Sequence, residues 1–157
     1  MSVETPAFNK LFTVEQANNM LPLVRAIVAD LQSLYLELVE RQRRLDHLAS
    51  GREDDASDPY SDELRAMESD MESQRNRLRG FVAELRELGV ECKDPAQGLI
   101  DFPSRQDGEI VYLCWKLDEP EVLHWHPLDA GFAGRRPLTA GAAAGDDTNG
   151  LNRDLAS

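Results

Sequence analysis

The sequence has few cysteines, few aromatic residues and no long apolar run, and each shortage excludes a class of protein. Its two cysteines, Cys92 and Cys114, are too few for a disulfide-rich secreted scaffold. No stretch of 18 apolar residues is present, so we expect no membrane-spanning helix. The N-terminal residues lack the basic and apolar segments of a secretory signal. These features together predict a cytoplasmic protein.

Positive charge is also scarce. The chain has 17 Lys and Arg against 29 Asp and Glu, a formal net charge of -12. Nucleic-acid binding depends on a basic patch, and peripheral membrane anchors depend on clustered Lys and Arg. We therefore expect an acidic protein that binds neither nucleic acids nor membranes. Its 157 residues are enough for one ordinary domain.

The first long helix is predicted over about residues 14–50. Thr13 and Gln16 have the spacing of a capping box, in which each side chain bonds to the other residue's backbone N–H. Pro22 predicts a kink or a short break near residues 18–22. Behind the cap, residues recur in steps of three and four, which is typical of a coiled-coil seam with one polar member. The seam consists of Ala17, Leu21, Val24, Val28, Leu31, Tyr35, Leu38, Gln42, Leu45 and Ala49.

A second helix is predicted over about residues 59–88, after an acidic loop at 51–58. Asp58 suits the N-cap position and Pro59 the first helical position. The two helices are expected to form an antiparallel hairpin in which Gln42 faces Gln74, either as a polar layer that fixes the register or as a pair tolerated near the loop. The second seam consists of Leu64, Met67, Met71, Gln74, Leu78, Phe81, Leu85 and Leu88.

The periodicity changes after Gly89 to the pattern of short strands. We expect strands over 98–103, ended by Pro103, over 109–117 and over 121–126, with turns at 104–108 and 118–120. The predicted fold is mainly α, of the α+β class. It has a leader at 1–12, a helical hairpin at 13–90, a small antiparallel sheet at 91–138 packed on the hairpin through Trp115 or Trp125, and a disordered Gly/Ala-rich tail at 139–157.

Several short sequence elements resemble one known family. They include Asp101-Phe102-Pro103, Leu113-Cys114-Trp115-Lys116 and Trp125-His126, and the N-terminal segment from Phe12 to Pro22. Over about residues 10–138 the chain resembles a bacterial family called domain of unknown function 2203. The resemblance implies a small, prokaryotic, cytosolic protein and carries no activity.

The sequence contains none of the common enzyme motifs for phosphate binding, dinucleotide binding, zinc proteolysis or serine hydrolysis. The candidate constellation is instead a metal site made by Cys114, His124 and His126, with Asp101 and Glu119 nearby. His124 and His126 are two residues apart, so a strand would direct both imidazoles to one face. A thiolate with two imidazoles suits zinc or another divalent transition metal.

The register of the predicted hairpin decides whether Cys114 joins these histidines. An odd number of residues in the turn places Cys114 opposite His124 on the same face, and an even number sends it to the other face. The competing interpretation is that Cys114 is a small buried hydrophobe and that the histidines pack beside Trp125.

Arg135 and Arg136 form a second candidate site, because adjacent cations in an acidic protein could hold an anion. The alternative is that they make internal ion pairs with the acidic body of the protein.

Three functional hypotheses follow from these features. The first is a structural or interaction protein that forms a homodimer through a second apolar stripe on the first helix, at Met20, Leu23, Ile27 and Leu34. The second is a metal- or anion-binding module with its site on the C-terminal sheet. The third, an enzyme, has the least support, since no motif places a base or a nucleophile.

Overall fold

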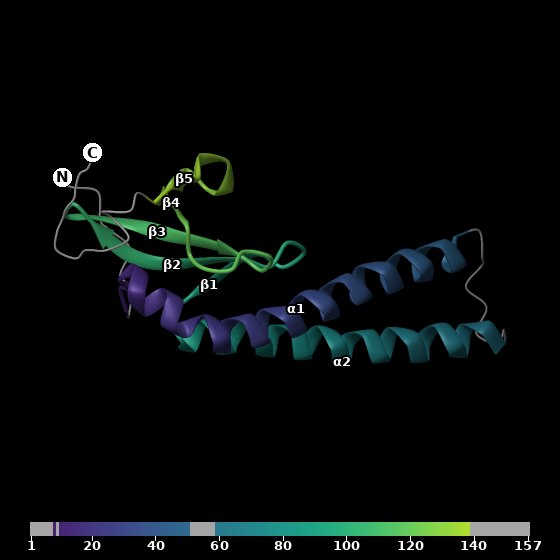
Figure 1. Cartoon of the computed structure of the whole chain (residues 1–157). Coiled ribbons are helices and arrows are strands. Elements are labelled where there is room, and N and C mark those ends of the chain that lie inside the picture. The colour runs from purple at the N-terminus through teal and green to yellow at the C-terminus, as the bar shows by residue number, and fades with distance from the viewer. Residues whose placement is uncertain (1–7, 9, 51–58, 139–157) are drawn as a thin grey trace, which may run out of the picture.

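Two long helices are followed by a five-stranded antiparallel sheet, as Figure 1 shows for the computed structural model. The structure describes residues 8, 10–50 and 59–138. The predicted α+β class is confirmed, as are the two helices, α1 (Val14–Ala49) and α2 (Pro59–Glu87). The expected acidic loop with its Asp58 cap, the tail and most of the leader lie outside the described residues.

Helix α1 begins with the capping box that the sequence predicts. The Thr13 hydroxyl accepts from the backbone N–H of Gln16, and the Gln16 side chain accepts from the N–H of Thr13, both at 3.0 Å. Of the two predicted outcomes at Pro22, a kink or a short break, the break is absent, since α1 is continuous through this residue. Pro22 is exposed, whereas Leu21 and Val24 are buried and hold the inner side of the helix against the core.

The two helices pack along most of their predicted seams and bury two groups of side chains. The exceptions include Ala49, a seam residue that is exposed, and Leu34, which is buried although the prediction placed it on the second stripe. The group nearest the sheet, here called the sheet-side core, includes Leu31 and Leu85, both fully buried. The second group, the hairpin core, consists of Leu34, Leu38, Leu45 and Met71. Leu78 contacts both groups. The hairpin therefore extends beyond the sheet as a two-helix arm (Figure 1).

The two seam glutamines bind arginines of the opposite helix rather than each other. The Gln42 carbonyl accepts from Arg75 at 3.0 Å, and the Gln74 carbonyl accepts from Arg41 at 2.7 Å. Both bonds cross between the helices, close to the level at which Gln42 and Gln74 were predicted to face each other. This geometry favours the interpretation of the glutamines as a polar layer that fixes the register.

The sheet follows chain order, β1-β2-β3-β4-β5, and has two more strands than the sequence predicts. Its strands are β1 (Glu91–Asp94), β2 (Leu99–Gln106), β3 (Glu109–Lys116), β4 (His124–Pro127) and β5 (Arg136–Pro137), with a short 3-10 turn, η1 (Phe132–Gly134), before β5. Strands β1 and β5 have four and two residues, too few for alternation along the sequence to reveal them.

Strand β2 does not end at Pro103, which corrects the prediction. It continues to Gln106, and the turn occupies only Asp107 and Gly108. The backbone N–H of Phe12 donates to the Pro103 carbonyl at 2.7 Å. In an antiparallel strand the N and the carbonyl of one residue face the same side, so the Pro103 nitrogen faces Phe12 and not β3. The ladder to β3 therefore loses no donor.

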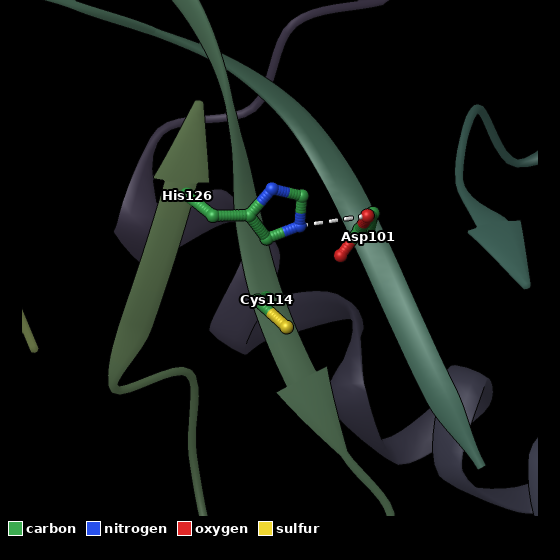
Figure 2. Close-up of side chains that lie close together, drawn as sticks. All are labelled: Asp101, Cys114 and His126. Atoms are coloured by element: carbon green, nitrogen blue, oxygen red, sulfur yellow. Dashed lines mark hydrogen bonds and ion pairs between the residues drawn. The ribbon is translucent and has the colours of Figure 1, made fainter. Parts of the chain in front are cut away.

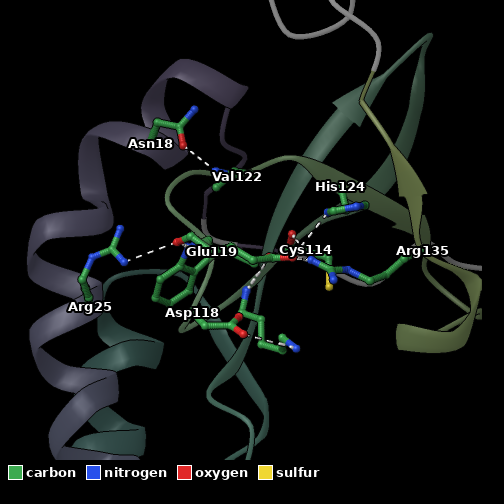
Figure 3. A network of polar contacts seen from close by, with 10 residues as sticks. Asn18, Arg25, Cys114, Asp118, Glu119, Val122, His124 and Arg135 are labelled. Atoms are coloured by element: carbon green, nitrogen blue, oxygen red, sulfur yellow. Dashed lines mark hydrogen bonds and ion pairs between the residues drawn. The ribbon is translucent and has the colours of Figure 1, made fainter.

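The third predicted strand also begins later than expected, at His124 instead of residue 121. Residues 117–123 form a loop that is bonded to α1 and to β3 (Figure 3). The Val122 N–H donates to the Asn18 side-chain oxygen at 2.7 Å, and the Trp115 indole N–H donates to the Glu119 carbonyl at 2.9 Å. These bonds hold the segment away from a ladder with β3.

The sheet covers the N-terminal half of α1 with one face. Ile100, Phe102, Leu113 and Trp115 belong to the sheet-side core, and Trp125 packs against it, which agrees with the predicted packing. Because side chains alternate along a strand, the residues between them face the other way. Within the described residues, no helix combines the length and the apolar character that a bilayer crossing needs.

The second apolar stripe of α1 is partly used within the chain. Leu34 is buried in the hairpin core, and Met20 and Ile27 are half-buried against the sheet-side core. Leu23 keeps 50% of its surface exposed.

The two seam leucines of the sheet-side core should dominate the stability of the hairpin. We expect Leu31→Ala and Leu85→Ala each to lower the free energy of unfolding by about 2–5 kcal/mol in urea denaturation, because each leaves a cavity in a fully buried site. Leu36→Ala is the matched control, since Leu36 keeps 47% of its surface exposed, and it should change the free energy of unfolding by less than about 0.5 kcal/mol. Equal losses in all three variants would contradict this core.

Candidate metal site

The strand register brings side chains from three strands together on the face of the sheet opposite α1. Asp101 of β2 pairs with Cys114 of β3, and Cys114 pairs with His124 of β4. His126 lies one step further along β4, opposite Tyr112. The connection at 117–123 has an odd number of residues, so Cys114 shares a face with both histidines.

Asp101, Cys114 and His126 form the closest group, here called the buried triad (Figure 2). One oxygen, the sulfur and one ring nitrogen lie within 4.8 Å of one another. The three residues expose 1%, 0% and 2% of their surface, respectively. Ionisable side chains are seldom buried this completely unless they are paired or bind an ion.

The hydrogen bonds of His126 define the roles of its two nitrogens. Nδ1 lies 2.7 Å from the carbonyl oxygen of Pro127, which can only accept, so Nδ1 carries a proton and donates it. Nε2 lies 3.0 Å from Oδ2 of Asp101. An unprotonated Nε2 and a carboxylate oxygen are both acceptors and cannot bond to each other. Either a proton or a metal ion must therefore lie between Nε2 and Oδ2 of Asp101.

Burial destabilises the ionised, negatively charged forms of Asp101 and Cys114. It raises the pKa of the Asp101 carboxyl above its usual value, even though the adjacent His126 acts in the opposite direction. Burial also raises the pKa of Cys114 to about 12, and the charge of Asp101 adds to the rise. Oδ1 of Asp101 is buried without a hydrogen-bond partner among the described residues. The triad therefore has a ligand atom without a partner, and a positive charge placed beside it would favour the ionised forms of Asp101 and Cys114.

Tyr112 and Glu91 border the triad, and the sequence did not identify them. The Tyr112 ring lies 5.4 Å from the His126 ring, and its hydroxyl donates to Glu91 at 3.1 Å. Lys93 lies over the Tyr112 ring at 4.7 Å and pairs with Glu91 at 2.8 Å. Prediction of these contacts needs the pairing of β1 with β2, and β1 is too short to be recognised from sequence.

Glu119, another predicted ligand, binds Arg135 instead of joining the triad. Its carboxylate lies 2.6 Å from the Arg135 guanidinium and accepts from the Lys116 N–H at 2.9 Å (Figure 3). Burial alone would raise the pKa of Glu119, but Arg135 and this backbone bond hold it below its usual value. His124, the remaining predicted ligand, has its Nδ1 3.6 Å from Glu119 and lies outside the triad.

The two arginines of the candidate anion site do not act together. Arg135 is occupied by Glu119 and by the carbonyl of Cys114, to which it donates at 3.3 Å. Arg136 is exposed and lies over the Trp125 ring at 5.1 Å. The structure thus favours the alternative of an internal ion pair for Arg135.

Comparisons with known proteins identify a family and no closer relative. The family model described as "Uncharacterized conserved protein (DUF2203)" matches residues 10–138, the region over which the sequence resembles that family. No curated protein and no solved structure matches the chain.

The other cysteine, Cys92, provides a test of how burial affects a thiol in this protein. Cys92 packs against the sheet-side core, and burial raises its pKa from 9.0 to about 11. The unfolded chain therefore releases this proton first, so stability is lost as the pH rises from about 9 to 11. We expect the free energy of unfolding to fall less steeply over this range in Cys92→Ala than in the wild type. Parallel pH profiles in urea denaturation would contradict the burial.

Proposed function

The chain belongs to the DUF2203 family, and we propose that it is a metal-binding protein whose sheet holds one divalent transition-metal ion, with zinc the best fit. The ligands are Asp101, Cys114 and His126. The observation that carries the proposal is the mutual approach of their three ligand atoms, from three neighbouring strands, to within 4.8 Å.

The distances suit a metal of this size. Ligand bonds of about 2.0–2.3 Å place the ligand atoms of a tetrahedral site about 3.3–3.8 Å apart. Atoms that lie within 4.8 Å of one another need to move by only about 1 Å to reach this separation. Strands β2 and β3 are paired along their whole length, so they hold two of the ligands on a rigid frame.

The donor set also suits zinc. A thiolate, a carboxylate and a neutral imidazole carry two negative charges, which a divalent cation balances. The bond from His126 Nδ1 to a backbone carbonyl leaves Nε2 as the lone-pair nitrogen, an arrangement common among metal-bound histidines. The unpaired Oδ1 of Asp101 offers a further lone pair. The ion would take the place of the protons of the triad and balance the negative charges that burial disfavours.

Our proposal includes the cytoplasm as the compartment. Both cysteines are free thiols, and the cytoplasm keeps thiols reduced and therefore available as metal ligands.

Metal content is the direct test of this function. We expect full-length protein, incubated with Zn²⁺ under reducing conditions and then desalted, to retain about one ion per chain by elemental analysis. Cys114→Ser and Asp101→Asn should retain almost none, because each removes a charged ligand while keeping the shape of the side chain. Zn²⁺ should raise the thermal midpoint of the wild type, since it binds the folded state.

The matched control is Cys92→Ser, which changes the other cysteine on the opposite face of the sheet. It should retain as much metal as the wild type. A wild type that keeps no zinc, or a Cys114→Ser variant that keeps as much as Cys92→Ser, would overturn the proposal.

Self-association through α1 is a second candidate, favoured by one feature of the surface. Leu23 exposes 50% of its surface, and it lies on the same side of α1 as the half-buried Met20 and Ile27. A second copy of the chain, packed along this side, would cover all three residues.

Sedimentation tests this candidate. We expect wild-type protein at tens of micromolar to sediment as a dimer and Leu23→Glu to sediment as a monomer that keeps the far-UV circular dichroism spectrum of the folded protein. Ala29→Glu adds the same charge to exposed surface elsewhere on α1 and should remain a dimer. A monomeric wild type would rule the homodimer out.

A further inference from the structure

His124 lies next to the buried triad and is not used by it. It is directly opposite Cys114 in the β3–β4 pairing. Side chains at such positions have Cβ atoms about 4.5–5.5 Å apart on one face of the sheet. The row Asp101, Cys114 and His124 therefore crosses three strands, with His126 one step along the same face as His124.

The polar atoms of His124 are incompletely satisfied. Nδ1 is buried and has no hydrogen bond among the described residues. Its nearest charged neighbour is Oε2 of Glu119, at 3.6 Å, while Oε1 is held by Arg135 and by the Lys116 N–H (Figure 3). Glu119 is thus held beside Nδ1 as an acceptor that a small movement of the His124 ring would bring within hydrogen-bond distance, and Nε2 remains to bind an ion.

We infer that His124 is the fourth protein ligand of the metal, so that the ion is enclosed by Asp101, Cys114, His124 and His126 and keeps no position for water. This inference rests on the proposed function. Four protein ligands make a closed, structural site, whereas catalytic zinc keeps an open position. The ion would then fasten β4 to β2 and β3, and its role is structural and not hydrolytic.

The burial of the triad supports a closed site, and the exposure of His124 gives it room to reach the ion. The three triad residues are at most 2% exposed, which leaves little access for a substrate. His124 reaches the ion by a rotation of its side chain, because its nitrogens now lie outside the 4.8 Å group. Its side chain is 29% exposed, so it has room to turn.

Cobalt substitution tests the number of protein ligands. Full-length apoprotein is titrated with Co²⁺, whose visible absorption reports coordination, and azide is then added as a probe for an open position. We expect the wild-type spectrum to be indifferent to azide. His124→Ala should bind Co²⁺ more than about 100-fold more weakly, beyond the 10–100-fold cost of losing an outer-sphere partner, and its spectrum should change when azide is added.

The matched control is His47→Ala, which removes the exposed histidine of α1 and should behave like the wild type. His124→Gln, which keeps a polar side chain of similar size, should repeat the result of His124→Ala, and thermal melts of the apoproteins establish that both variants fold. A wild-type spectrum that responds to azide, with undiminished affinity in His124→Ala, would overturn the fourth ligand and leave the metal site standing. A wild type that binds no Co²⁺ would overturn both.

Discussion

The attachment of the 117–123 loop to α1 is the constraint on which the candidate site depends. Asn18 accepts the N–H of Val122, and Arg25 donates to the carbonyls of Glu119 and Pro120 at 3.3 and 3.2 Å. The buried Trp115 ring donates to this same loop. These contacts fix the length of the loop, and the length of the loop sets the register of β4 against β3. A shift of one residue would turn both histidines to the opposite face.

The helical hairpin makes this attachment possible. Its seams bury the apolar side of α1, and the capping box fixes where α1 starts. Asn18 and Arg25 therefore lie at defined positions along α1, where they contact the loop. One face of the sheet contributes Trp115 and its neighbours to the same core. The other face does not pack against the helices, so it can carry polar and charged side chains. The side chains of the buried triad lie on this face and are nonetheless buried. A buried carboxylate, thiol and imidazole destabilise the fold unless a proton or a metal ion balances them.

Much of the fold could be predicted because it depends on local patterns. The capping residues and the three-four spacing specified both helices to within a residue or two. The strand predictions were less accurate where a contact with a residue distant in sequence determines where a strand begins or ends. Pro103 ends a strand only if its nitrogen must face a ladder, and here it faces Phe12. Strand β1 depends on its pairing with β2, which short alternation cannot reveal.

The sequence by itself determined that His124 and His126 share a face, because side chains alternate along a strand whatever surrounds it. It also determined that Asp101 and Cys114 lie on neighbouring strands. Only the tertiary structure decided that Cys114 joins the histidines, that Asp101 bonds to His126, and that Glu119 is taken by Arg135. The reason is physical: register is set by the whole path of a loop and by what anchors it, and these contacts join residues as many as 104 positions apart.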